Sequence, residues 1–377
     1  MKIAIVGAGI IGASCAYHLS KLGLDVIVLE RNPNPAMGST AKSAAGIRHQ
    51  FSHRGNIKMS QYSASEYENF EELTSVNANF KKNGYLFLIA KEQEKDWQKQ
   101  IELQKSLGVN VEFLSQQATK EKFDYINTNA LLGSSLSYDD GTLDPNAISF
   151  GYIKAAKKMG CQVFLEQEVR ELNYINRQWQ IKTNSNKYFA DAIINAAGPH
   201  AASIAKLAGF EIPVLPYRRN VYMTGPVENF KHPSPLIIDM TSGVYLRSEG
   251  ERIIFGLSNH NEKAGFNEQV DWDWLEHTLS LALPRFPFLE STGLDYKSCW
   301  AGLYSITPDH FPILGKMPNS SFYNAVGFSG HGVQHAAAVG RILAEEISTG
   351  KVSSFNIDDF RFERFSKKTQ AFESNIV

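Results

Sequence analysis

The sequence predicts an α/β fold in which a domain built on a parallel sheet is joined to a second domain built on an antiparallel sheet. Three observations support this prediction. A run of small branched residues at 3–6 leads through a glycine turn and a helical pattern to a second apolar run at 26–29, which is the order strand, helix, strand. Another apolar strand, 190–197, also ends in a glycine turn. Between 214 and 256, apolar and polar residues alternate as in an antiparallel sheet.

The clearest motif lies in the first thirty residues. Gly7, Gly9 and Gly12 stand between the first strand and the helix, and Glu30 follows the second strand, 18 residues after Gly12. In a Rossmann-like unit these glycines permit a tight turn, the approach of a pyrophosphate and close helix packing. The helix N-terminus favours the phosphates, and the acid accepts hydrogen bonds from ribose hydroxyls. The motif predicts dinucleotide binding, but it does not distinguish FAD from NAD and names no reaction.

Composition narrows the class of protein. With 377 residues, 43% of them hydrophobic and 20% charged, the chain is expected to be soluble, globular and divided into two domains. A net charge of −1 lacks the basic excess that proteins use to bind nucleic acid or an anionic membrane. Small molecules are therefore the expected partners. No stretch approaches the ~20 apolar residues that cross a bilayer. Residues 2–16 have some features of a secretory signal, but the glycines of the phosphate turn interrupt them.

The cysteines indicate the compartment. Cys15, Cys161 and Cys299 are too few and too scattered for a disulfide framework or a metal cluster. We therefore expect a cytoplasmic protein without a metal site.

The order of the predicted elements indicates that two insertions interrupt the nucleotide-binding domain. Its three pieces are 1–79, 144–212 and 300–377. The two insertions, 80–143 and 213–299, are expected to form a second, antiparallel-sheet domain that contacts the substrate. Within the middle piece of the nucleotide-binding domain, three short strands at 162–183 are expected to form a small meander.

A second glycine loop, 327–334, opens a helix expected at about 335–348. If the dinucleotide were NAD, the first glycine loop would already bind its pyrophosphate, and the second loop would have no obvious role. A reduced flavin carries negative charge along its pyrimidine edge, which a helix N-terminus stabilises. A tight structural turn is the alternative role of the loop. The two glycine-opened helices together favour FAD.

These motifs resemble those of the D-amino-acid-oxidase superfamily of flavoenzymes. Within it the sequence is most similar to the β subunits of sarcosine oxidase and of dye-linked L-proline dehydrogenase. The matching stretches run from one end of the chain to the other and are 7–12 with Glu30, 46–51, 84–88, 195–198, 300–304 with 307–309, 327–332 and 361–364.

The resemblance implies a Rossmann-like FAD-binding domain with FAD bound in an extended form and without a covalent link. Relatives that attach FAD do so through a cysteine where this chain has Gly302, and Cys299 lies three residues away. The residues expected to bind FAD are Gly7, Gly9, Ile10, Ile11, Gly12, Glu30, Arg31, Ser39, Ser43, Ala44, Gly46, Val169, Ala197, Gly198, Gly302, Gly327, Gly330, His331, Gly332, Val333 and Gln334.

The resemblance also implies the residues that meet the substrate. Arg48 is expected to neutralise a substrate carboxylate, since a guanidinium offers a bidentate fork to that group. A surface ion pair is its alternative role. His49, Tyr245 and Tyr304 are candidates for the substrate face of the flavin, and core packing is the alternative for each.

We therefore expect oxidation of the C–N bond of a small amino acid, by hydride transfer to the flavin N5 atom and release of an imine. A secondary amine, such as an N-methyl amino acid or proline, is the preferred substrate. The alternatives are deamination of glycine or a D-amino acid, and an FAD-stabilised scaffold subunit without turnover.

The electron acceptor is left open between dioxygen and a dye, a quinone or a protein, as is the presence of a partner subunit. Monomeric sarcosine oxidases carry a lysine where this chain has Gln334, and a second one, which promotes reaction with dioxygen, where Ile254 aligns. Both departures favour a dehydrogenase-like enzyme or a different substrate.

Overall fold

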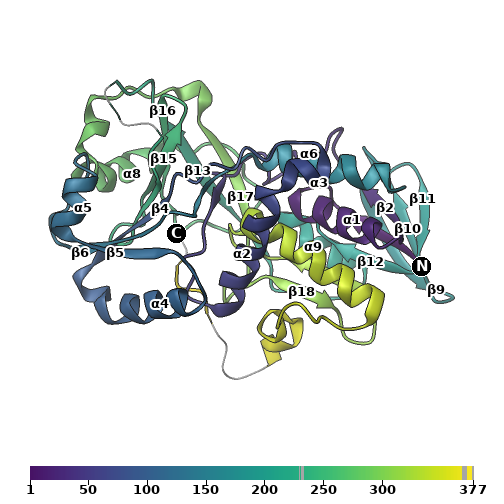
Figure 1. Ribbon diagram of the computed structural model, residues 1–377. Helices are drawn as coiled ribbons and strands as arrows, with labels where there is room; N and C mark the ends of the chain where they lie inside the picture. The colour runs from purple at the N-terminus through teal and green to yellow at the C-terminus, as the bar shows by residue number, and fades with distance from the viewer. Residues whose placement is uncertain (229, 231–232, 367–371, 376–377) are drawn as a thin grey trace.

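The computed structural model describes residues 1–228, 230, 233–366 and 372–375. The described residues form two lobes that lie side by side, each built on its own large β-sheet (Figure 1). None of the helices in these ranges is long and apolar enough to cross a lipid bilayer.

One lobe contains a six-stranded sheet among the described residues, with the order β18-β19-β12-β1-β2-β8. Its strands are β1 (Lys2–Val6), β2 (Asp25–Leu29), β8 (Gln162–Phe164), β12 (Ala192–Asn195), β18 (Ile313–Lys316) and β19 (Phe322–Val326). All neighbours pair in parallel except β18, which runs antiparallel to β19 at one edge. The central strands β1 and β12 are apolar apart from Lys2 and Asn195 at their ends, because both faces of the sheet are covered.

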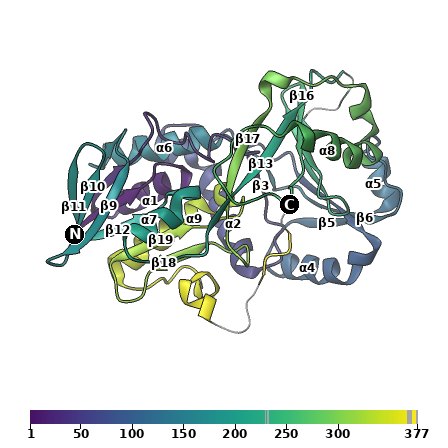
Figure 2. The ribbon, with the colours of Figure 1, turned by 180° about the vertical axis from the view of Figure 1, so that it is seen from behind.

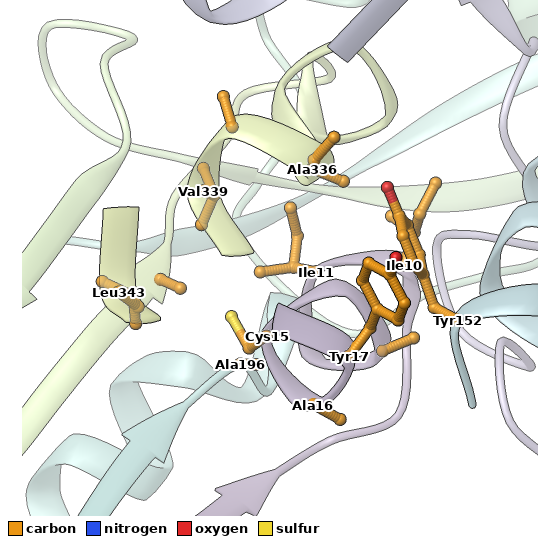
Figure 3. Close-up of a cluster of buried hydrophobic side chains, with 14 of the residues drawn as sticks. Ile10, Ile11, Cys15, Ala16, Tyr17, Tyr152, Ala196, Ala336, Val339 and Leu343 are labelled. Carbon is orange, nitrogen blue, oxygen red and sulfur yellow. The ribbon is translucent and has the colours of Figure 1, made fainter. Parts of the chain in front are cut away.

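Helices cover one face of this sheet. They are α1 (Ile10–Lys21), α6 (Pro145–Lys158) and α9 (Gly332–Thr349). Ile11 and Cys15 of α1 lie among Ala336, Val339 and Leu343 of α9 in one buried cluster (Figure 3). Since β1 and β19 run in the same direction, α1 and α9 both begin at the carboxyl edge of the sheet, which brings their N-terminal ends to the same side of the lobe.

A three-stranded meander covers the other face (Figure 2). Its strands are β9 (Val169–Ile175), β10 (Gln178–Thr183) and β11 (Lys187–Ala190), and α7 (Ala201–Leu207) packs beside them. The sequence placed the stretch that begins at Gln162 in this meander, but β8 instead pairs in parallel with β2. The strand β8 has only three residues and no buried position, so its pattern does not indicate which sheet it joins.

The other lobe contains an eight-stranded sheet among the described residues, with the order β17-β13-β16-β15-β14-β4-β6-β5. Its strands are β4 (Tyr85–Ala90), β5 (Val111–Ser115), β6 (Leu131–Ser137), β13 (Leu215–Met223), β14 (Leu236–Asp239), β15 (Tyr245–Glu249), β16 (Arg252–Gly256) and β17 (Trp300–Ile306). The two insertions meet where β4 pairs in parallel with β14, so the expected antiparallel sheet contains one parallel pair. No hairpin joins β4 to β14, and their relative direction is therefore free of the constraint that a hairpin imposes.

The remaining elements connect or cover the two sheets. Helix α2 lies between the lobes (Figure 1). The remaining helices and strands are α2 (Arg54–Glu68), α3 (Phe70–Thr74), α4 (Glu94–Ser106), α5 (Gln116–Lys122), α8 (Trp272–Arg285), β3 (Gly46–Ile47) and β7 (Gly141–Thr142). Short 3₁₀ helices are η1 (Lys91–Gln93), η2 (Gly198–His200), η3 (Pro287–Ser291), η4 (Tyr296–Ser298), η5 (Asp358–Phe360) and η6 (Phe362–Ser366).

The strand β17 begins at the start of the third predicted piece, 300–377, yet it pairs with β13 in the larger sheet. The chain therefore crosses from one lobe to the other after this strand. Residues 367–371 and 376–377 of that piece lie outside the described residues, as do 229 and 231–232 of the second insertion.

Candidate active site

A cavity of about 450 Å³ lies where the two lobes meet. One wall is formed by the carboxyl ends of β1, β2 and β12, and the opposite wall by β13, β15 and β17. The carboxyl edge of a parallel sheet is the usual place for a ligand in α/β folds, because the loops and helix N-termini converge there.

The first glycine loop forms one end of the cavity. Gly7 has φ +104°, and a Cβ on this residue would stand 2.6 Å from the carbonyl oxygen of Ala196. The backbone of β1 therefore approaches β12 in a way that only glycine permits. Helix α1 begins at Ile10, whose amide donates to Thr40 Oγ1 at 3.1 Å. The other amides of the first helical turn have no intrahelical acceptor, which makes this end an anion-binding site.

Glu30 stands beside this loop, at the end of β2, and is only 6% exposed. Its Oε2 accepts a hydrogen bond from the amide of Ala8 at 2.7 Å, and its Oε1 accepts from Asn32. Among the described residues no cation pairs with this carboxylate. Its remaining lone pairs are available to hydroxyl donors in the cavity, so the buried acid fits the ribose of a dinucleotide.

Most of the residues expected to bind FAD line the cavity. They are Gly7, Gly9, Ile10, Ile11, Glu30, Arg31, Ser39, Ser43, Ala44, Val169, Ala197, Gly198, Gly302, Gly330, Gly332 and Val333. Five others do not line it: Gly12, Gly46, Gly327, His331 and Gln334. Gly12 lies behind the loop, where a Cβ would stand 2.0 Å from the carbonyl oxygen of Gly7.

The other end of the cavity is lined by two aromatic rings and an arginine. Tyr245 comes from β15, Tyr304 from β17 and Arg219 from β13. The guanidinium carbon of Arg219 lies 5.4 Å from the centre of the Tyr304 ring. Burial raises the pKa of Tyr245 and of Tyr304, so both hydroxyls stay protonated and available as donors. The structure thus brings both predicted tyrosines to the cavity.

Arg48, in contrast, does not line the cavity and is only 3% exposed. Its guanidinium carbon lies 4.3 Å from the centre of the Phe51 ring. Its Nη1 donates to the carbonyl of Gln50 at 2.9 Å, its Nη2 donates to the carbonyl of Asn375, and Nη2 also lies 3.4 Å from His331 Nε2. The chain itself therefore uses both terminal nitrogens of this arginine.

The partner of Arg48 belongs to a C-terminal stretch, residues 372–375, that returns to the region between the lobes. Within it Glu373 is fully buried and accepts hydrogen bonds from the amide and hydroxyl of Ser52 and from Asn56 Nδ2. Asn375 is also buried. Through the carbonyl of Asn375, this stretch takes up one of the two terminal nitrogens of Arg48.

His49 lies away from the cavity as well. Its Nδ1 is 2.5 Å from Oδ1 of Asp140, which is fully buried. Burial lowers the pKa of His49, but the Asp140 carboxylate raises it and outweighs the burial, so the net pKa is raised. The pair lies beside the short ladder that β3 forms with β7 and does not line the cavity.

Two neutral histidines accompany Arg48. Burial, and then the charge of Arg48, hold the pKa of His331 well below its ordinary value and lower the pKa of His335 to about 3. A protonated imidazole would stand beside a guanidinium in a buried site, which both desolvation and repulsion oppose.

Sequence reasoning did not single out Arg219. The alternating pattern predicts a strand at 220–224, which begins just after this arginine. In the structure β13 begins at Leu215, and around Pro216 it pairs with β17. Two consecutive arginines in a strand were the available signal, since alternation places one of them on each face.

The sequence matches the family described as FAD dependent oxidoreductase over residues 2–346. The FAD-dependent oxidoreductase domain-containing protein 1 of Xenopus laevis is 33% identical, over 100% of this chain and 84% of that protein. Mitochondrial sarcosine dehydrogenase of Mus musculus is 26% identical, over 93% of this chain and 40% of that protein.

Solved structures show the same fold. L-proline dehydrogenase from P. horikoshii superposes with a TM-score of 0.90 at 28% identity, over 98% of both chains. Glycine oxidase from Geobacillus kaustophilus superposes with a TM-score of 0.84 at 20% identity, over 96% of this chain and 98% of that one. These matches confirm the predicted α/β fold, the superfamily and the cofactor, FAD. The chain belongs to the family of FAD-dependent oxidoreductases that includes the D-amino-acid-oxidase relatives its motifs resemble.

Proposed function

We propose that this oxidoreductase acts on the C–N bond of a small amino acid whose nitrogen is secondary, such as an N-methyl amino acid or proline, and releases an imine. The observation that carries the proposal is the continuity of one cavity from Glu30 to Tyr245, Tyr304 and Arg219. A nucleotide-binding end and an aromatic end with a cationic side chain share one space. Relatives named sarcosine dehydrogenase, dimethylglycine dehydrogenase and L-proline dehydrogenase support the choice of a substituted nitrogen.

The residues of the cavity suit an extended dinucleotide. The N-terminal end of α1 would hold the pyrophosphate and Glu30 the ribose of the adenosine half. Gly330 and Gly332 line the cavity at the start of α9, whose N-terminal amides and dipole would stabilise negative charge on a flavin ring. Bound FAD supplies the acceptor for a hydride from the substrate.

The aromatic end suits a small substrate with an apolar part and a charged part. Tyr245, Tyr304 and Phe328 line the cavity there and limit the space for water around the reacting carbon. Their rings offer apolar surface to an N-alkyl group or a pyrrolidine ring. The arrangement also raises the strength of each polar contact made at this end, because the surroundings are of low dielectric.

The acceptor that we propose is a dye, a quinone or a protein rather than dioxygen. Gln334 stands in α9 as a neutral side chain, and Ile254 is fully buried in an apolar cluster with Val221, which lines the cavity. The described part of this region therefore offers no cation from these two positions to stabilise reduced oxygen species.

Anaerobic reduction of the flavin tests this function. The FAD-loaded protein is mixed without oxygen with sarcosine, N,N-dimethylglycine, L-proline, glycine or D-alanine, and the loss of the visible flavin absorbance is followed. We expect bleaching by sarcosine or L-proline. Bleaching only by glycine or D-alanine, with release of ammonia, would support the deaminating alternative. A flavin that no compound bleaches would support the scaffold alternative.

Readmission of air tests the acceptor in the same cuvette. Slow return of the colour, accelerated by an added dye or quinone, is the expected result. Immediate return would identify an oxidase.

A further inference from the structure

Two adjacent arginines of β13 have opposite surroundings. Arg218 donates to Glu262 Oε2 at 3.1 Å, to Asp271 Oδ2 at 2.7 Å and to the carbonyl of Gln269. Arg219 points to the other face of the strand, as the alternation of side chains requires, and lines the cavity. It has no acidic partner within the described residues. One side chain is therefore held by two carboxylates, and the other faces the cavity without one.

The donors of Arg219 are only partly used. Its Nη1 donates to the carbonyl of Arg218 at 2.8 Å, while its Nε is buried without a hydrogen-bond partner. Nη2 also has no hydrogen-bond partner among the described residues. Nε and Nη2 share one edge of the planar guanidinium, where their N–H groups form the fork that matches the two oxygens of a carboxylate.

The guanidinium of Arg219 also forms no ion pair among the described residues. Burial lowers the pKa of its guanidinium, and the charge of Glu262, which pairs with Arg218, opposes this shift. The group stays charged because its ordinary pKa lies far above neutrality. A half-buried cation without an anion is unfavourable, since it has lost part of its hydration and gained no counter-charge. An anionic ligand in the cavity would supply that counter-charge.

The other cations of the cavity wall are paired or lie elsewhere. Lys42 pairs with Glu268 at 2.7 Å, and Arg170 pairs with Glu168 at 2.6 Å. Arg31 directly follows Glu30, at the end of the cavity that the first glycine loop forms. Arg48 has both terminal nitrogens bonded to backbone carbonyls and does not line the cavity.

We propose that Arg219 binds the carboxylate of the substrate through its Nε–Nη2 edge, and that Arg48 instead anchors the C-terminal stretch 372–375. The proposal rests on the proposed function for the identity of the anion. The hydroxyls of Tyr245 and Tyr304 have no hydrogen-bond partner among the described residues. They would donate to the lone pairs of the carboxylate oxygens that the guanidinium leaves free. Arg219 thereby determines the preference for anionic over uncharged amines.

Ligand binding without turnover tests this assignment. Pyrrole-2-carboxylate and its uncharged analogue pyrrole-2-carboxamide are titrated into the FAD-loaded protein, and the change in the visible flavin spectrum gives each Kd. Arg219→Gln should raise the Kd for the carboxylate roughly 10- to 100-fold, because charge-assisted hydrogen bonds are lost. The Kd for the carboxamide should change less than about 3-fold, since its hydrogen bonds are neutral and weaker.

Two further variants keep the experiment decisive. Arg219→Lys keeps the charge but not the fork, so an intermediate rise of about tenfold is expected, and this variant replaces Arg219→Gln if the latter loses its FAD. Arg48→Gln should leave the ratio of the two Kd values unchanged.

The opposite pattern, with the ratio lost in Arg48→Gln and kept in Arg219→Gln, would overturn the proposal. So would a wild-type protein that does not bind the carboxylate. The proposed function fails separately: carboxylate binding that depends on Arg219, in a protein whose flavin no amino acid bleaches, would support the anion site and reject the oxidation.

Discussion

The ring of Tyr304 packs against Gly330 so closely that a Cβ on the glycine would stand 2.5 Å from the ring carbon Cε2. Gly330 belongs to the glycine loop that opens α9, and Tyr304 comes from β17 of the larger sheet. The contact joins the loop expected to serve the flavin to the aromatic end of the cavity. The position of the loop is therefore coupled to that of the Tyr304 ring by the absence of a side chain at Gly330.

Replacing this glycine should disturb both ends of the site. Gly330 has φ +93°, so Gly330→Ala costs about 1–2 kcal/mol for the backbone alone, and the methyl group displaces the Tyr304 ring. We expect a lower Tm and a raised KM for the substrate. Gly209→Ala is the matched control, because Gly209 has φ +82° and no neighbour within 4 Å of the added atom. Equal effects of the two variants would show that the tyrosine contact is unimportant.

Glu30→Gln should weaken FAD binding. The carboxylate accepts from the amides of Ala8 and Asn32, and a glutamine would present its NH₂ group to one of these donors. We expect the Kd of FAD to rise about tenfold or more, measured by quenching of FAD fluorescence on addition to the apoprotein. Glu168→Gln is the control, since Glu168 also lines the cavity but is partly exposed and pairs with Arg170. A smaller effect at Glu30 than at Glu168 would contradict its assignment to the ribose.

The pair of His49 and Asp140 should make stability depend on pH. The pKa of His49 is raised in the folded protein, because Asp140 outweighs the effect of burial. The folded state therefore binds the proton more tightly, and the pair contributes its full stability below the unfolded pKa of about 6.5. That contribution is lost as the pH rises through the raised pKa. The Tm of the wild type should fall relative to that of His49→Gln as the pH rises above about 6.5, and parallel curves would exclude the pair as the cause.

Glu373→Ala should release the C-terminal stretch. The buried carboxylate satisfies three donors from Ser52 and Asn56, and each donor left without a partner costs about 1–3 kcal/mol. We expect a Tm several degrees lower, accompanied by faster hydrogen exchange in the first turn of α2. Ser374→Ala, at an exposed neighbouring position, should leave both quantities unchanged. If the two variants behave alike, residues 372–375 do not contribute to stability.

Local patterns predicted the nucleotide-binding half of the molecule well. The strand, glycine turn, helix and acid of residues 2–30 depend on neighbours within one unit, so the order of residue types already specifies them. The second glycine-opened helix was also predicted from its local pattern, although α9 begins at Gly332 and not at the expected 335.

Contacts between distant segments were beyond the reach of such patterns. The arginine at 48 was expected to meet a substrate, but its nearest acceptors include the carbonyl of Asn375, 327 residues away. The parallel pairing of β4 with β14 likewise joins two separate insertions. The division into five sequence pieces, the cytoplasmic location, the partner subunit and the roles of individual residues stay predictions.

The sheet that carries the cofactor site has consequences for how the protein is made. Its strand β1 begins at residue 2, but its partner β12 begins only at residue 192 and the next strand of the sheet, β19, at residue 322. Such long loops must close before the sheet gains its stability, so folding is expected to be slow. Gly332 and Val333 of α9 line the cavity and α9 packs on α1, so chains truncated before Gly332 should bind FAD more weakly than the full chain.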